Sequence, residues 1–223
     1  TDYNLQMNNA IWTAECVKIA KELGCTRFVG AGSIMEKEVI AILNRNGSRP
    51  SMSYIYGLGK LAAHCICQSV AAEVDIEFVW AIITNAYGVG ELSPRFINST
   101  LRKIINNESL NFTEATQNYD FVYIRDVANA IYLISENGKS FSEYVIGSSQ
   151  AKPLKNFILE LTEAVSFQNE LTFGSIPYNG VNLPIETFDT SNTEMETKFK
   201  AEVSFREGVR KTMEWLRTYY NNL

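Results

Sequence analysis

Three polar side chains lie where they could transfer a proton to or from a hydroxyl group. Ser33 directly follows a short apolar run, and Tyr56 and Lys60 lie four residues apart in a stretch with helical periodicity. Side chains at positions i and i+4 of a helix lie one above the other on the same face. We therefore expect the Tyr56 phenol and the Lys60 amine to be neighbours.

A tyrosine beside a lysine could serve as a general base or acid. The pKa of a free tyrosine is about 10, so its phenolate is scarce at neutral pH. An ammonium group a few ångströms away favours the phenolate, and a shift of roughly three pKa units requires about 4 kcal/mol. A desolvated charge pair can provide that much. A hydroxyl at the end of a neighbouring strand, such as that of Ser33, could orient the substrate oxygen that loses its proton.

In the first half of the chain, helix-like and strand-like patterns alternate. They predict helices over residues 8–23, 39–43 and 53–74, and strands over residues 27–31 and 76–84. Both strands are near-continuous apolar runs, which are typical of parallel sheets buried on both faces. The alternation predicts an α/β fold with right-handed crossovers.

The second half is expected to form a smaller mixed α/β lobe. Its patterns predict helices over residues 94–107, 126–135, 153–165 and 205–220, and short strands over residues 110–112, 121–124 and 144–147. Asp126 is expected to cap the second of these helices, and Pro153 to open the third.

The composition excludes several classes of partner. The chain has 223 residues, of which 46% are hydrophobic, and its net charge is −5. It contains no run of Lys and Arg, so neither nucleic acid nor an anionic membrane is an expected partner. No stretch approaches the roughly 18 apolar residues of a membrane span, and the polar start has no basic n-region. We therefore expect a cytoplasmic protein.

The cysteines and the histidine do not form a metal-binding pattern. Zinc sites use two close Cys pairs or accompanying histidines. Here only Cys65 and Cys67 are close together, and His64 is the only histidine. We expect buried free thiols, no metal site, and a structural or surface role for His64.

Several motifs, taken in order, resemble those of one enzyme family. They are N-A-I-W-T at residues 9–13, R-F-V-G-A-G-S ending at Ser33, Y-G-L-G-K-L-A-A-H at 56–64, T-N-A-Y-G-V-G at 84–90 and Y-D-F-V-Y-I-R-D-V-A at 119–128. The set resembles the extended short-chain dehydrogenase/reductase family, in the NAD-dependent epimerase/dehydratase group typified by UDP-galactose 4-epimerase. The resemblance covers nearly the whole chain.

The resemblance implies a role for five residues. Tyr56 would be the general base or acid, Lys60 would tune it and hold the ribose of the cofactor, and Ser33 would bind the reacting oxygen. Asn85 would contact the nucleotide sugar, and Asn9 would belong to the network around the cofactor. NAD or NADP is the implied cofactor and a nucleotide sugar the implied substrate. A homodimer through the Tyr56 helix and its partner helix is also implied.

The same resemblance implies a Rossmann-like parallel sheet that lacks its N-terminal strands. Residues 1–92 would be the C-terminal part of the cofactor domain, residues 119–148 would return to it, and residues 93–223 would form mainly the substrate lobe. The family's glycine-rich turn, which binds the pyrophosphate, is absent from the sequence. The family register puts it in the roughly 75 to 90 residues before Thr1. We expect a truncated or incompletely observed chain, inactive by itself, with a natural remnant as the alternative.

Departures from the family motifs narrow the expected reaction. The 4,6-dehydratases have an Asp-Glu pair directly after their catalytic threonine, whereas Ile34 and Met35 follow Ser33 here and Glu36 comes one position later. Dehydration is therefore disfavoured, and we predict a nucleotide-sugar epimerase or 4-keto reductase with a Ser-Tyr-Lys site. The alternative is a catalytically inactive, cofactor-free binding or regulatory protein of the same fold. The missing glycine turn favours that alternative, and the retained Ser-Tyr-Lys set opposes it.

Overall fold

The computed structural model describes residues 2–44, 46–47 and 50–221, and the chain divides into two compact units. The first unit runs up to Thr84 and continues in Asn129–Ile146 and Asp189–Lys200. The second consists of Asn85–Ala128, Gly147–Phe188 and the residues from Ala201 on. Each unit has its own sheet or strand pairs and its own buried core.

The first unit contains a three-stranded parallel sheet in the order β1 (Arg27–Ser33), β2 (Glu77–Ile83), β7 (Ser142–Ile146). The central strand β2 is the longest apolar run of the sequence, and its Phe78, Trp80 and Ile82 side chains are almost completely buried. The predicted α/β fold with a parallel sheet is confirmed.

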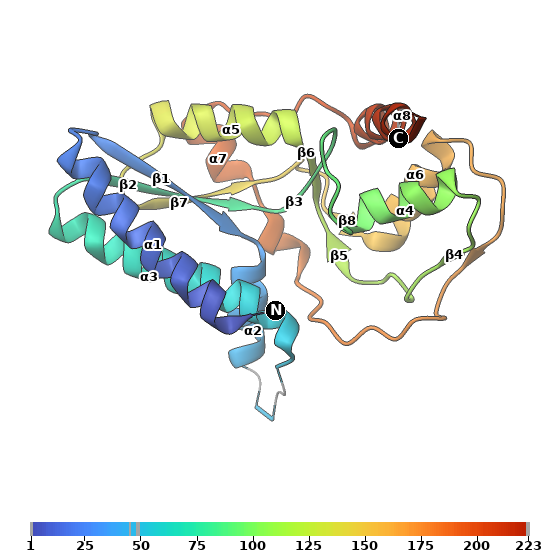
Figure 1. The fold of residues 1–223 in the computed structure, drawn as a ribbon, viewed down its shortest axis with the longest axis horizontal. Coiled ribbons are helices and arrows are strands. Elements are labelled where there is room, and N and C mark those ends of the chain that lie inside the picture. The colour runs from blue at the N-terminus through green and yellow to red at the C-terminus, as the bar shows by residue number, and fades with distance from the viewer. Residues whose placement is uncertain (1, 45, 48–49, 222–223) are drawn as a thin grey trace. The chain divides into compact units, whose positions relative to one another are not determined.

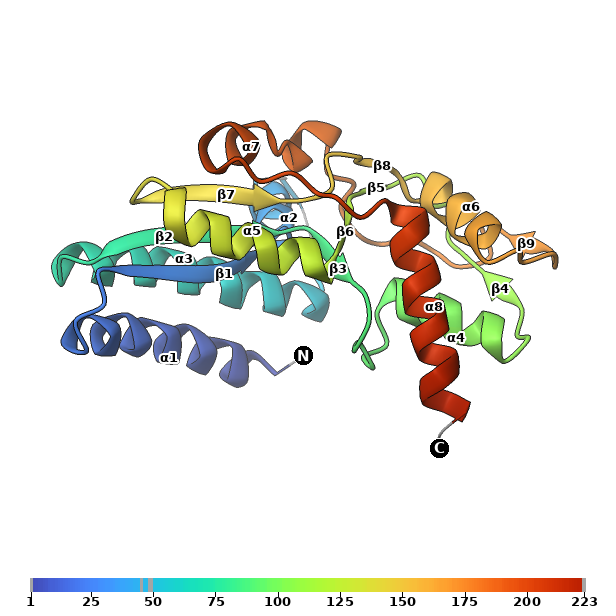
Figure 2. The ribbon, with the colours of Figure 1, turned by 90° about the horizontal axis from the view of Figure 1, so that it is seen from above.

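Two long helices cover one face of this sheet and α5 covers the other (Figures 1 and 2). The helices α1 (Tyr3–Glu22) and α3 (Ile55–Glu73) pack along each other, and α3 contacts β1 and β2. The shorter α2 (Met35–Leu43) and the 3₁₀ turn η1 (Met52–Tyr54) pack beside α3. The sheet therefore has an apolar layer on both faces, as its apolar strands require.

The second unit packs three helices around a core of aromatic and aliphatic side chains. The helices are α4 (Phe96–Ile105), α6 (Leu154–Ala164) and α8 (Phe205–Asn221). Strand pairs join β3 (Asn85–Tyr87) to β6 (Phe121–Tyr123), β4 (Leu110–Asn111) to β9 (Leu171–Thr172), and β5 (Asn118–Tyr119) to β8 (Lys152–Pro153). The 3₁₀ turn η2 (Ile185–Phe188) completes the unit.

Three helix starts differ clearly from the prediction, and one of them is that of α2, which begins at Met35 and not at residue 39. The first helix begins at Tyr3, not at residue 8, because the Asp2 carboxylate accepts the N–H groups of Asn4 at 2.8 Å and Leu5 at 3.3 Å and so caps it. Asp126 does not cap a helix, because α5 (Ile124–Asn137) has already begun two residues earlier. The Asp126 carboxylate instead accepts the N–H of Val203 at 2.9 Å.

The unit boundaries also differ from the expected ones. Residues from Asn85 on belong to the second unit because β3 pairs with β6. A third segment of the first unit, which the sequence does not indicate, contains α7 (Ser191–Thr197). It packs on β7, where the Thr193 hydroxyl donates to the carbonyl of Val145 at 2.8 Å. Among the described helices, none is long and apolar enough to cross a membrane.

Candidate active site

Ser33 is the last residue of β1, at the carboxyl edge of the parallel sheet, and pairs with Ile83 of β2. Ligands of α/β proteins bind at this edge. Only 8% of Ser33 is exposed, and its Oγ accepts the N–H of Met35 at 3.3 Å. The backbone N–H of Ser33 donates to the Glu36 carboxylate at 2.8 Å. The serine is thus held at both its side chain and its backbone.

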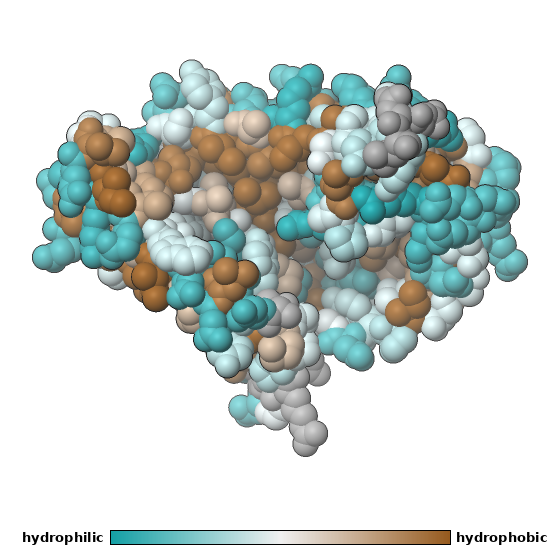
Figure 3. All heavy atoms as spheres, in the orientation of Figure 1, coloured by the Kyte–Doolittle hydropathy of each residue, from teal (hydrophilic) through white to brown (hydrophobic). Residues whose placement is uncertain are grey.

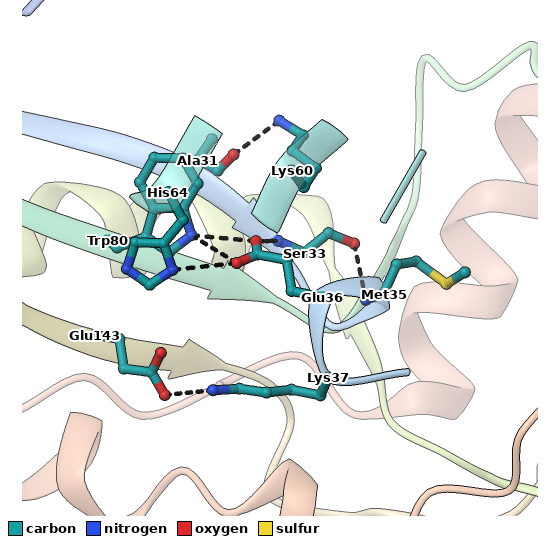
Figure 4. A network of polar contacts seen from close by, with 9 residues as sticks. All are labelled: Ala31, Ser33, Met35, Glu36, Lys37, Lys60, His64, Trp80 and Glu143. Atoms are coloured by element: carbon teal, nitrogen blue, oxygen red, sulfur yellow. Dashed lines mark hydrogen bonds and ion pairs between the residues drawn. The ribbon is translucent and has the colours of Figure 1, made fainter. Parts of the chain in front are cut away.

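Tyr56 and Lys60 lie in the first two turns of α3, and both are half-buried. The Lys60 ammonium donates to the carbonyl of Ala31 on β1 at 2.8 Å (Figure 4). The Tyr56 hydroxyl has no hydrogen-bond partner among the described residues. It is therefore available to a ligand.

The two glycines of the Y-G-L-G-K motif allow neighbouring helices to approach α3. A Cβ atom on Gly57 would lie 2.6 Å from the Met35 carbonyl oxygen, and one on Gly59 would lie 2.8 Å from the Cβ of Gln6. Neither position can hold a larger residue without a shift of α2 or α1. The glycine at position 59 is therefore explained by the close packing of α1.

A cavity of about 480 Å³ lies against α1, α3 and β1. Asn9, Tyr56 and Lys60 line it together with apolar side chains that include Phe28 and Trp80. Figure 3 shows apolar surface over β1, between α1 and α5. The structure therefore brings three of the predicted site residues to one cavity. Ser33 is not among its lining residues but follows Ala31, the partner of Lys60, by two positions.

Asn85 lies in the second unit, as the first residue of β3, and its N–H donates to the carbonyl of Asp120 at 3.0 Å. That unit has a cavity of its own, of about 380 Å³. Aromatic rings, among them Phe96, Phe112 and Tyr119, line it. Gln117 also lines it and is only 4% exposed, yet its Oε1 has no hydrogen-bond partner among the described residues. No sequence pattern indicates a site role for this glutamine.

Sequence reasoning also missed the role of Glu36. Only 2% of this residue is exposed, and its carboxylate contacts Ser33, His64 and Trp80 (Figure 4). A sequence signal for it exists, because Ser33 and Glu36 have the S-x-x-E spacing of a helix capping box and α2 begins between them, at Met35.

The structure corrects one prediction about cysteines. All four thiols are free, but only Cys67 is buried, whereas Cys16, Cys25 and Cys65 are exposed. Burial raises the pKa of the Cys67 thiol to about 11, so it stays protonated at neutral pH. The His64 ring stacks on Trp80 with 4.7 Å between ring centroids, which is the structural role expected for it.

Comparison with known proteins shows what this chain is similar to. The model of the NAD dependent epimerase/dehydratase family matches residues 2–147. CDP-abequose synthase of Salmonella muenchen is 23% identical over 141 residues, which are 62% of this chain and 48% of that protein. Human dTDP-D-glucose 4,6-dehydratase is 24% identical over 176 residues, which are 75% of this chain and 49% of that protein. The chain thus spans about half the length of these two relatives.

Among solved structures, UDP-glucuronic acid 4-epimerase from Bacillus cereus, in complex with UDP-glucuronic acid and NAD, has a similar fold. The TM-score is 0.75 at 16% identity, over 95% of this chain and 68% of that one. At this identity the similarity is one of fold.

Proposed function

Because this chain belongs to the NAD dependent epimerase/dehydratase family, we propose that it carries the proton-transfer site of an enzyme that epimerises a nucleotide-linked sugar or reduces its 4-keto group. Family membership confirms the resemblance that the motifs indicate. The observation that carries the proposal is the cavity lined by Asn9, Tyr56 and Lys60, beside the strand that ends in Ser33.

Each of the three site residues has a distinct proposed role. The Tyr56 hydroxyl, which has no described partner, moves the proton at the sugar hydroxyl. The Lys60 ammonium places a positive charge at the same cavity. The Ser33 Oγ already accepts the N–H of Met35, so its own proton is free to be donated to the substrate oxygen.

The cavity residues fit the nicotinamide-ribose end of NAD or NADP. Asn9 offers an amide and Lys60 an ammonium, which are donors suited to ribose hydroxyls and a carboxamide. The Thr13 hydroxyl donates its proton to the carbonyl of Asn9 at 2.7 Å, so it can serve a ligand as an acceptor. None of the described residues forms a glycine-rich turn for the pyrophosphate, so the proposal covers only the nicotinamide end. When bound, the nicotinamide accepts or donates the hydride.

We assign the nucleotide of the substrate to the cavity of the second unit. Its aromatic rings suit the flat face of a base, and the unpaired Oε1 of Gln117 suits an N–H donor on the edge of that base. Asn85 is proposed to contact the nucleotide sugar.

The proposed assembly is a homodimer through α1 and α3. These helices pack along each other and leave apolar side chains exposed, with Ile11 54%, Ile19 50% and Ile66 42% accessible. A charge placed among such side chains would oppose association. We expect Ile66→Glu to shift the full-length protein from dimer to monomer in sedimentation velocity. A dimer of unchanged stability would exclude this interface.

The substitution Tyr56→Phe tests the proposed catalytic role. We expect kcat of the full-length protein to fall at least ~100-fold, because the proton-transferring hydroxyl is lost while the ring is kept. Turnover is measured on UDP-, dTDP-, CDP- and GDP-linked hexoses with NAD and NADP, and on the 4-keto forms of these sugars with NADH and NADPH as hydride donors. The matched control is Tyr132→Phe, at an α5 tyrosine that is 61% exposed, and it should leave kcat unchanged. Undiminished turnover by Tyr56→Phe would refute the assignment.

The same measurement addresses the alternative of a cofactor-free binding protein. If the full-length wild type binds a nucleotide sugar in calorimetry, but neither binds NAD or NADP nor turns over any sugar, the enzymatic proposal is wrong. The retained fold would then serve binding alone.

A further inference from the structure

We propose that Glu36 is the positioning residue of the candidate active site, holding Ser33 in place and linking it to the helix that carries Tyr56 and Lys60. The inference rests on the proposed function of these three residues. Glu36 itself lines neither the cavity of the first unit nor that of the second. It therefore acts through other residues and not on the substrate.

The Glu36 carboxylate is buried and surrounded by N–H donors. Oε1 accepts the backbone N–H of Ser33 at 2.8 Å and the indole N–H of Trp80 at 3.1 Å, and Oε2 lies 3.3 Å from the same indole nitrogen. A buried carboxyl group is costly unless such donors satisfy it. Three elements, the end of β1, the start of α2 and the middle of β2, are therefore tied together at one side chain.

His64 extends this network to α3. Its Nδ1 lies 3.2 Å from Glu36 Oε2, and its ring stacks on that of Trp80 (Figure 4). His64 follows Lys60 by one helical turn and Tyr56 by two turns. The Glu36 carboxylate thus binds both the backbone of Ser33 and His64 of α3. These two contacts hold Tyr56 and Lys60, which lie on the same helix, in position relative to Ser33.

The strand β1 leaves room for the network by having two glycines. A Cβ atom on Gly30 would lie 2.1 Å from the Trp80 ring. One on Gly32 would lie 2.2 Å from the Trp80 indole nitrogen and 2.7 Å from Glu36 Oε1. Any other residue at either position would displace the indole or the carboxylate. The two glycines of V-G-A-G-S therefore leave space for the Trp80 indole and the Glu36 carboxylate close to Ser33.

The geometry at Ser33 also indicates why its position affects the reaction. Ser33 and Glu36 bond as in a capping box, in which the serine oxygen accepts a helix N–H and the glutamate holds the N–H of the serine. With its lone pair used in this way, the serine hydroxyl is oriented as a donor. Loss of the carboxylate would free the Ser33 backbone, and a misplacement of about 1 Å at a reacting group can reduce the rate about 100-fold.

A graded pair of variants of the full-length protein tests the proposal. Glu36→Leu removes both acceptor oxygens, and we expect kcat to fall about 100-fold while the KM values for sugar and cofactor stay within about three-fold. Glu36→Gln keeps one acceptor oxygen, and we expect a fall of about three- to ten-fold. The substrates are the same nucleotide-linked hexoses with NAD and NADP, and their 4-keto forms with NADH and NADPH.

Glu143→Leu and Glu143→Gln are the matched controls. Glu143 pairs with Lys37, the neighbour of Glu36 in α2, at 2.6 Å, and 43% of its side chain is exposed. Loss of such a surface ion pair should leave kcat within about two-fold of wild type. Equal kcat values in the Glu36 and Glu143 variants would overturn the proposal. If Glu36→Leu does not fold, an unchanged kcat in Glu36→Gln overturns it by itself.

Amide hydrogen exchange at Ser33 separates this inference from the proposed function. We expect exchange of the Ser33 amide to be at least ~10-fold faster in Glu36→Leu, or in Glu36→Gln if only that variant folds, than in the Glu143 controls. A wild type that turns over no nucleotide sugar would contradict the proposed function. The exchange rate of the Ser33 amide would then be the one test of whether Glu36 holds Ser33 in place. An exchange rate equal to that of the Glu143 controls would overturn the inference about Glu36.

Discussion

The Lys60 ammonium is bonded to a backbone carbonyl of the neighbouring strand and not to an acidic side chain. That bond places the charge at the cavity wall beside Tyr56. A hydrogen bond from a charged donor contributes more than one between neutral groups. The position of this lysine therefore depends on the contact between α3 and β1, which local sequence does not specify.

We expect Lys60→Met to weaken cofactor binding and to lower kcat, each by about 10- to 100-fold, because a charged donor is lost while the apolar stem remains. Fluorescence titration with NADH and NADPH measures the first effect and steady-state turnover the second. Lys37→Met is the control, because it removes a lysine from an exposed ion pair of the same unit. Cofactor affinity equal to that of the control would show that Lys60 does not hold the cofactor.

Part of the site could be predicted from the sequence. The i, i+4 spacing placed Tyr56 and Lys60 together on α3, and the apolar run before Ser33 placed it at a strand end. The carboxylate of Glu36 was missed, although the S-x-x-E pattern was available, and its bonds to Trp80 and His64 join residues far apart in the chain. Such contacts depend on how the elements pack, which no local pattern reports.

At the scale of the elements, α2 carries a second acid, Glu38, which is half-buried. Burial raises the pKa of the Glu38 carboxyl from its ordinary 4.5 to about 7. Between these two pH values the folded chain keeps a proton that the unfolded chain has lost. The contribution of Glu38 to the free energy of unfolding therefore falls as pH rises from about 4.5 to 7, and remains low above pH 7.

We expect Glu38→Gln to raise the free energy of unfolding at pH 8 by about 1 to 3 kcal/mol and to change it much less at pH 4.5. The reason is that the amide never ionises in its buried position. Denaturant titrations at the two pH values measure the difference. Glu73→Gln, at an exposed position of α3, should show no such pH dependence. A gain at pH 4.5 as large as that at pH 8 would contradict burial as the cause.

Most helices and the main strands agree with their periodic patterns, but element ends do not. The prediction placed the start of α1 too late because the residues before position 8 alternate between polar and apolar types and show no apolar helical face. Only the Asp2 cap shows that the helix begins at Tyr3. Asp126 has the residue type of a cap, yet its carboxylate accepts a distant N–H from Val203. Helix ends are decided by single hydrogen bonds, which are harder to infer than a repeated apolar face.

At the scale of the whole molecule, the two units are interleaved along the sequence. The chain leaves the first unit after Thr84, enters it again from Asn129 to Ile146, and returns once more from Asp189 to Lys200. A boundary near residue 92 was the natural prediction, because the character of the sequence changes there. The pairing of β2 with β7, from Val79 opposite Ser142 to Ile83 opposite Ile146, is non-local and has no local signal.

This interleaving makes the stability of the first unit depend on late segments. Four of its large hydrophobic side chains that are at most 1% exposed come from beyond residue 92, namely Ile134, Tyr144, Ile146 and Phe199. Burying side chains of this size contributes about 1.5 to 3 kcal/mol each. Their sum is comparable to the whole stability of a typical domain, which is about 5 to 15 kcal/mol.

We therefore expect a fragment of residues 1–92 not to fold by itself. Without β7 the central strand β2 loses one of its two partners and exposes its apolar residues. Circular dichroism of the fragment should show no cooperative thermal transition, and its ¹H–¹⁵N spectrum should show poorly dispersed amides. The chain of 223 residues should show a cooperative transition and dispersed amides. A cooperative transition in the fragment, near that of the 223-residue chain, would mean that the first 92 residues form the core without the late segments.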